Sequence, residues 1–204
     1  LNNAITRLSG AVQLLTVWKK GSHRTMAFTL SDREKQVVRL ITLGCTLNET
    51  ARILSLTPRA AKTCKERAMQ ELGVNKVALL TRVALQKRIT SMTDQLTPAE
   101  KSLCEHRPPT RSRQRHMVTT ELTQKEAQVV RLTSLGCTQE EAAAILNVSP
   151  SAVSNRKTRA MAKLDVNKVA ILVRLAIKHR ITSMKDKLTA AEKRKSGRKN
   201  DGWN

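Results

Sequence analysis

Apolar residues recur every three to four positions along most of the chain, which is the spacing of one face of an α-helix. The stretch from Thr138 to Asn167 predicts a short helix, a tight turn and a longer helix with a polar, basic outer face. Thr138 and Glu141 have the spacing of a capping box at the start of the short helix. Ser149 followed by Pro150 indicates the start of the longer one. Two capped helices joined in this way form a helix-turn-helix.

The chain contains this pattern twice. A shift of 92 residues aligns 30–101 with 122–193 without a gap, and about 41 of the 72 aligned positions are identical, which indicates an internal duplication. Each copy predicts four helices, and a repeated cap signal at Thr97 and Thr189 indicates a short fifth. The predicted N-caps of the four helices are Ser31, Thr46, Thr57 and Asn75 in copy one, and Thr123, Thr138, Ser149 and Asn167 in copy two.

These elements predict an all-α fold with two tandem four-helix helix-turn-helix domains, at residues 30–101 and 122–193. Residues 102–121 are expected to form an extended basic linker, because Pro108 and Pro109 disfavour helix. Residues 1–29 are expected to form an amphipathic arm that packs on its own protein, with docking on a partner or a membrane surface as the alternative. Residues 194–204 are expected to be a disordered basic tail.

The amino-acid composition restricts the classes of molecule that the protein is expected to bind. The chain has one Phe, two Trp and no Tyr, so its cores must be aliphatic. A net charge of +22 indicates an anionic partner. Double-stranded DNA is favoured over a membrane because the basic residues lie on a motif as well as in the tails. An RNA-binding protein would be expected to carry more aromatic stacking residues. The sequence contains no apolar run long enough to span a membrane.

The cysteines and histidines predict no catalytic site, metal site or cofactor. None of the four cysteines forms a CxxC pair, and their spacing is unlike a secreted disulfide framework. They are expected to be small buried residues of a protein in a reducing cytosol, associated with the nucleoid. The four histidines have no carboxylate or Cys partner at catalytic spacing, so we predict that the protein is not an enzyme.

Several spaced motifs resemble the LuxR-type (GerE-like) DNA-binding domain of bacterial transcription regulators. In copy one they are Ser31-Asp-Arg-Glu34, Leu43-Gly-Cys-Thr46, Glu49-x-Ala51-x-x-Leu54 and Leu72-Gly-Val-Asn-Lys76; copy two repeats them, ending with Leu164-Asp-Val-Asn-Lys168. The resemblance implies a four-helix domain whose third helix reads the major groove and whose fourth helix often mediates dimerisation. Self-association, or pairing of the two fourth helices within one chain, is therefore expected.

The outer face of each third helix supplies the candidate DNA contacts. The residues predicted to reach base edges are Lys62, Thr63 and Glu66 in copy one, and Ser154, Asn155 and Thr158 in copy two. The residues predicted to contact phosphates are Thr57, Arg59, Lys65 and Arg67, and in copy two Ser149, Lys157 and Arg159.

The sequence thus predicts a transcription regulator with two tandem domains that read different major-groove half-sites. A linker of twenty residues can extend about 66 Å, enough for half-sites about 34 Å apart. Two alternatives stay open. One is a sigma-factor-like protein that docks on a promoter and RNA polymerase. The other is a protein-interaction module in which copy one no longer reads DNA, for which the acidic Glu66 and Glu71 are the motivation.

Overall fold

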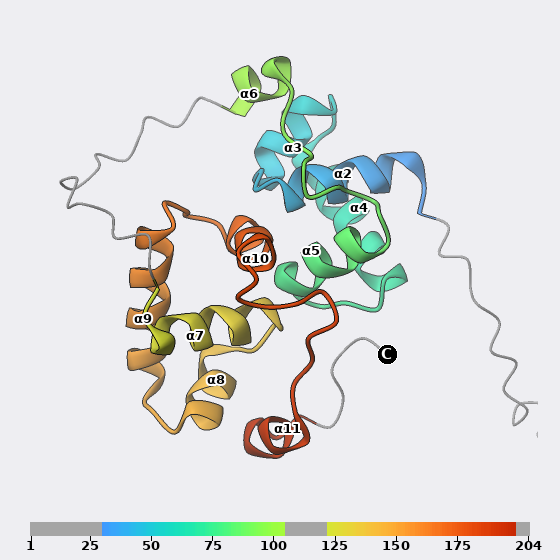
Figure 1. The fold of residues 1–204 in the computed structure, drawn as a ribbon. Coiled ribbons are helices and arrows are strands. Elements are labelled where there is room, and N and C mark those ends of the chain that lie inside the picture. Colours follow the sequence, from blue (N-terminus) through green and yellow to red (C-terminus); the bar gives the residue numbers. More distant parts are fainter. Residues whose placement is uncertain (1–29, 105–121, 199–204) are drawn as a thin grey trace, which may run out of the picture.

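The computed structural model describes residues 30–104 and 122–198, and all regular elements in these ranges are helices, which confirms the all-α prediction. The helices form two groups that correspond to the two copies (Figure 1). The N-terminal arm and most of the linker lie outside the described residues. Copy one contains α2 (Asp32–Thr42), α3 (Leu47–Ile53), α4 (Pro58–Glu71), α5 (Val77–Gln86) and α6 (Pro98–Cys104); copy two contains α7 (Gln124–Ser134), α8 (Gln139–Leu146), α9 (Pro150–Lys163), α10 (Val169–Lys178) and α11 (Ala190–Ser196).

The first three helices of each copy begin at the predicted N-caps. Helices α2, α3, α7 and α8 each start with a complete capping box, in which two side chains satisfy two otherwise unpaired backbone N–H groups. Thr57 and Ser149 cap α4 and α9, each followed by Pro at the first helical position. The fifth helices are also present, after cap bonds at Thr97 and Thr189.

The predicted caps of the fourth helices are wrong by one residue. Lys76 and Lys168, rather than Asn75 and Asn167, are the N-caps of α5 and α10, and neither makes a side-chain cap bond. The Lys76 ammonium group instead donates to the carbonyl of Gly136 in copy two, at 2.7 Å. Lys76 therefore has the extended backbone of an N-cap, while its side chain bonds to the other copy and not to its own helix.

The C-terminal tail is ordered further than predicted. Helix α11 continues to Ser196, with Gly197 as its C-cap. Beyond it, the Arg198 guanidinium donates to Glu141 at 2.9 Å and to the carbonyl of Gly136 at 2.6 Å. These contacts attach the end of α11 to the turn before α8 and to α8 itself. The predicted disordered tail therefore cannot begin at Arg194.

The cores are aliphatic, as the composition requires. In copy one, Val37 and Val38 of α2 pack with Leu79 and Leu80 of α5. In copy two the corresponding residues are divided between two clusters, one around Val129 and the other around Val130. Close packing of such side chains is the main source of stability for helices this short.

Two equivalent arginines attach the segment after each fourth helix to the first helix of the copy. Arg39 of α2 forms ion pairs with Asp94 at 3.0 Å and Glu100 at 2.7 Å. Arg131 of α7 makes the same pairs with Asp186 at 2.8 Å and Glu192 at 2.7 Å. Each arginine therefore fixes a loop and the start of the fifth helix together.

The two copies pack on one another through their fourth helices. Helices α5 and α10 are in contact and lie side by side in the middle of the molecule (Figure 1). The turn before α3 also approaches α10, because a Cβ placed on Gly44 would lie 2.7 Å from Ile171 Cδ1. The equivalent Gly136 has the equivalent neighbour, with its Cβ position 2.7 Å from Leu79 Cγ. Contacts that are reciprocal in this way are those of a two-fold axis.

Two buried arginines strengthen this pairing. Arg82 of α5 is 1% exposed and donates to Thr182 Oγ1 at 3.2 Å and to three carbonyls of the segment 183–186, the nearest at 2.6 Å. Arg174 of α10 is 8% exposed and donates to Thr90 Oγ1 at 3.4 Å and to the carbonyls of Ser91, Met92 and Asp94. Burial lowers the pKa of both arginines, but a guanidinium stays charged in a protein. The two copies therefore hold each other through matched, charge-assisted hydrogen bonds.

Candidate nucleic-acid interface

Helices α4 and α9 have one buried and one exposed face. Ala61 and Ala68 face the core in α4, as do Val153 and Ala160 in α9. These residues form the inner stripe of each helix, and Arg156 lies half-buried on the stripe of α9. Each helix packs on the two helices that precede it in its copy, which leaves the opposite side open to a ligand.

In copy one the predicted base-reading residues are all exposed, and two of them are paired with each other. The Lys62 ammonium lies 3.8 Å from the Glu66 carboxylate one turn further along α4. Thr63 donates its hydroxyl to the carbonyl of Arg59 at 3.0 Å. Lys62 would therefore have to leave Glu66 to reach a guanine, at a small cost because exposed ion pairs contribute about 0.2–1 kcal/mol.

In copy two the reading face is uncharged. Asn155 and Thr158 are exposed, and Ser154 is half-buried on the same side of α9. An asparagine in this place can accept from and donate to one adenine edge. Copy two thus presents a face with no acidic group among its predicted reading residues, unlike copy one.

The predicted phosphate-binding residues surround the two reading faces. Thr57 and Ser149 accept the N–H groups of Ala60 and Ala152 at 3.2 Å. Arg59, Arg67 and Arg159 are exposed, while Lys65 and Lys157 are half-buried. The structure brings each set onto one helix, and their contacts with DNA remain a prediction.

Lys65 and Lys157 line two equivalent hollows between the copies. The first, of about 310 Å³, also contains Lys168, and the second, of about 500 Å³, also contains Lys76. Each hollow lies where the turn before α3 or α8 meets the start of the other copy's fourth helix. Each thus combines a lysine from one recognition helix with a lysine from the other copy.

Acidic residues near this surface are engaged within the protein. The Glu34 carboxylate accepts the backbone N–H of Ser31 and lies 3.6 Å from Arg67, and its pKa is lowered chiefly by the Ser31 backbone bond. Glu126 accepts from Lys163 at 2.8 Å, which lowers its pKa. Each of these two carboxylates is thus paired with a basic side chain of α4 or α9, so neither adds an unpaired negative charge to this surface.

Sequence reasoning missed the two arginines that join the copies. Arg82 and Arg174 received no role in the sequence-based prediction, which considered only the apolar residues of the fourth helices. A signal was present, because an arginine occupies the same place in both largely apolar fourth helices, and both copies contain the segment Thr-Ser-Met-x-Asp that the other arginine binds. A charge repeated within an apolar helix therefore indicated a buried partner.

None of the helices in the described ranges is long and apolar enough to cross a membrane.

Residues 28–84 and 120–176 each match the GerE family, described as bacterial regulatory proteins of the luxR family, and together the matches cover more than half of the chain. No curated protein and no solved structure gave a significant match. The family's helix-turn-helix domain binds DNA in transcription regulation and is not an enzyme. The chain therefore belongs to the luxR family of bacterial regulatory proteins, and it contains the family's DNA-binding domain twice.

Proposed function

We propose that the chain regulates transcription as a dimer within one polypeptide, in which α4 and α9 read two half-sites of one DNA target. The observation that carries this proposal is the reciprocal packing of α5 and α10, with Arg82 and Arg174 each bound to the other copy. Dimeric helix-turn-helix proteins place two recognition helices in successive major grooves, about 34 Å apart. One chain would supply both helices here.

The two-fold relation of the copies sets the expected arrangement of the half-sites. A two-fold axis between α5 and α10 turns the recognition helices in opposite directions, so they would read inverted half-sites. Copies joined by an independent flexible linker would accept direct or inverted repeats at several spacings. A single preferred orientation and spacing is therefore a property of the paired structure.

The half-sites should differ in sequence. Lys62, Thr63 and Glu66 would contact one, and Ser154, Asn155 and Thr158 the other, with no identical residue at equivalent positions. The positions predicted to contact phosphate are shared more often, since Lys65 and Lys157 are equivalent, as are Arg67 and Arg159. The two copies would then contact the phosphates of their half-sites with similar affinity but recognise two different base sequences.

A second candidate is that copy one supports copy two and does not read DNA itself. The Lys62–Glu66 ion pair on the exposed face of α4 favours it, because a carboxylate on a reading face repels phosphate. In this case the target would contain one specific half-site beside a nonspecific one.

Selection of bound sequences from a random DNA pool with the full chain separates these possibilities. The proposal expects two different half-site sequences in inverted orientation at one spacing, and a footprint that covers both. Enrichment of a single half-site sequence would favour the supporting role of copy one. A strong loss of binding with salt and no enriched sequence would contradict sequence-specific regulation altogether.

A further inference from the structure

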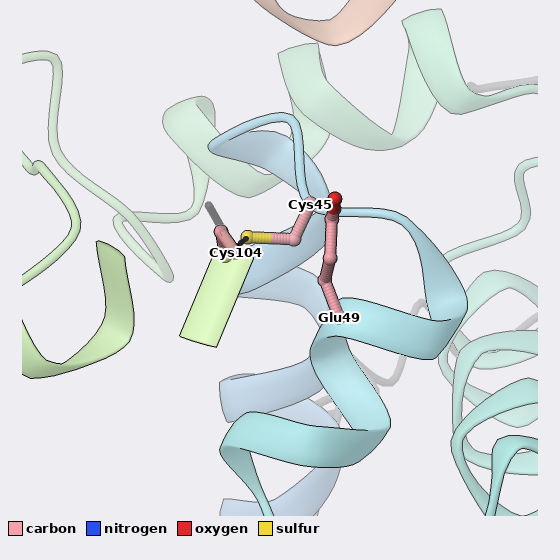
Figure 2. A group of neighbouring side chains, drawn as sticks. All are labelled: Cys45, Glu49 and Cys104. Atoms are coloured by element: carbon pink, nitrogen blue, oxygen red, sulfur yellow. Dashed lines mark hydrogen bonds between the residues drawn. The ribbon is translucent and has the colours of Figure 1, made fainter. Parts of the chain in front are cut away.

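Copy one contains a cluster of two cysteines and a carboxylate. Cys45 lies in the turn between α2 and α3, Glu49 in the first turn of α3 and Cys104 at the end of α6 (Figure 2). The two sulfur atoms are 3.8 Å apart. The sulfur atoms and a carboxylate oxygen all lie within 4.8 Å of one another. Three side chains that are 59 residues apart at their widest sequence separation thus converge on one point.

Copy two shows what occupies the equivalent place there. Cys137 and Glu141 correspond to Cys45 and Glu49, but Ser196 replaces Cys104. In copy two the carboxylate is neutralised by cations, since Arg198 donates to Glu141 at 2.9 Å and Lys76 lies 3.5 Å from it. Among the residues that the structure describes, no ion pair of Glu49 is found. Within the described residues, the copy that has the second thiol is thus the one whose carboxylate has no such cation.

The cluster is accessible. A hollow of about 160 Å³ opens onto Cys45, Glu49 and Cys104, and copy two closes its other side with Asn167, Lys168 and Ile171. Cys45 is buried, and the other two side chains are half-buried. An ion can therefore reach the three groups without unfolding either copy.

The spacing of the thiols fits a metal ion. Two thiolates bound to tetrahedral Zn²⁺ at about 2.3 Å each are about 3.8 Å apart, and the two sulfur atoms here already have that separation. A disulfide needs about 2.05 Å, so the thiols would have to move towards each other. Glu49 uses Oε2 to accept the Thr46 N–H in its capping box, which leaves Oε1 available as a third ligand.

We propose that Cys45, Glu49 and Cys104 form a binding site for a thiophilic divalent cation of the zinc class, present in copy one alone. Three protein ligands leave a fourth tetrahedral position for water. Binding would release the protons of the two thiols.

The ion would have the structural task that Arg198 has in copy two. It would join the end of α6 to the turn between α2 and α3, as the guanidinium joins the end of α11 to the carbonyls of Leu135 and Gly136. That turn contains Gly44, which packs on Ile171 of copy two. The metal would therefore stabilise the side of copy one that faces the other copy.

Titration of the reduced, metal-stripped full chain with Co²⁺ tests the site, because cobalt bound to thiolate gives charge-transfer and visible ligand-field bands. The proposal expects one equivalent bound with these bands, and a higher Tm after addition of Zn²⁺. Cys104→Ser should abolish both effects, and it introduces only the residue that copy two has at this place. Cys137→Ser in copy two is the matched control and should retain both. Glu49→Gln, which preserves the cap, should shift the titration to higher Co²⁺.

Three results would overturn the proposal. The first is the absence of thiolate bands in the reduced parent chain. The second is an equal loss of the bands in Cys104→Ser and Cys137→Ser. The third is a chain that takes up no Co²⁺ and forms a Cys45–Cys104 disulfide in air, which would make the pair a redox site instead.

Discussion

The two copies share the arginines by which they hold each other and differ at the residues predicted to reach DNA bases. Arg82 and Arg174 make the same bonds to the same segment of the other copy, whereas Lys62 and Ser154, at equivalent positions of α4 and α9, differ in charge. A duplicated domain can change its reading face without loss of stability, because that face is exposed. It can change its pairing face only if both copies change together. The shared arginines therefore build the pair, and the differing exposed residues would give each copy its own specificity.

The largest expected effect comes from removal of a pairing arginine. Arg174→Ala leaves the carbonyls of Ser91, Met92 and Asp94 without their donor inside the interface. The free energy of unfolding should fall by about 2–5 kcal/mol, since buried groups lose a charged partner. Urea unfolding measures this loss.

Arg82→Ala should have a similar effect, because its contacts are the reciprocal ones. Lys178→Ala, at an exposed position of the same helix as Arg174, is the control and should change stability by less than about 0.5 kcal/mol. Arginine variants as stable as this control would mean that the copies do not pair as described.

The contribution of the base-reading residues to DNA binding can be separated from that of the phosphate contacts. Asn155→Ala should remove about 1–3 kcal/mol of discrimination at one base pair of the half-site read by copy two. Lys157→Ala, two residues along the same helix, should instead weaken binding to all sequences and reduce the salt slope by about one. Competition binding at two salt concentrations distinguishes the two effects. An equal loss on all sequences for Asn155→Ala would show that it does not read a base.

A smaller effect is expected at the glycines of the interface. Gly136 has φ +75°, and a Cβ there would lie 2.7 Å from Leu79 of the other copy. Gly136→Ala combines an unfavourable backbone with overpacking and should destabilise by about 1–3 kcal/mol. Gly73→Ala is the control, because Gly73 has a similar φ of +65° with nothing within 4 Å of the added Cβ. Equal losses in the two variants would mean that Leu79 does not pack on this turn.

The smallest effect concerns acid stability. Burial opposes ionisation of Glu141, but bonds from the Thr138 N–H and Arg198 outweigh it, so its pKa lies below the ordinary 4.5. A carboxyl with a lowered folded pKa contributes stability that is present above pH 4.5 and is lost as the pH falls through the folded pKa. Glu141→Gln should therefore flatten the acid side of the stability profile, measured by urea midpoints between neutral pH and about pH 3. Glu140→Gln, at the exposed neighbouring position, is the control that removes one charge and keeps the Thr138 and Arg198 bonds to Glu141. An equally flattened profile in both variants would contradict the role of Glu141.

The sequence predicted the local features of the fold well. Caps such as Ser31 with Glu34 act over three residues, and the repeat of the same signal in copy two removed most ambiguity. The inner stripe of α4 was predictable for the same reason, because Ala61 and Ala68 follow the helix period. The family resemblance, confirmed by both matches, also indicated that the fourth helices pair.

The contacts between distant segments could not be predicted. Arg82 and Thr182 are 100 residues apart, and no local pattern states which loop a buried guanidinium will bind. The bond from Lys76 to the carbonyl of Gly136, 60 residues away in the other copy, has no local signal either. Cys45 and Cys104 lack the close spacing by which metal sites are recognised in a sequence, and only the packing of α6 on α3 brings them together.

Binding of the full chain to a DNA that contains both selected half-sites, with and without five inserted base pairs, tests the central claim most directly. Half a helical turn moves the second half-site to the opposite side of the duplex. If α5 and α10 hold the copies as a pair, the insertion should reduce the affinity to that of a single half-site. Undiminished affinity after the insertion, or equal affinity of isolated copy two for the intact target, would show that the copies do not act as one two-fold unit.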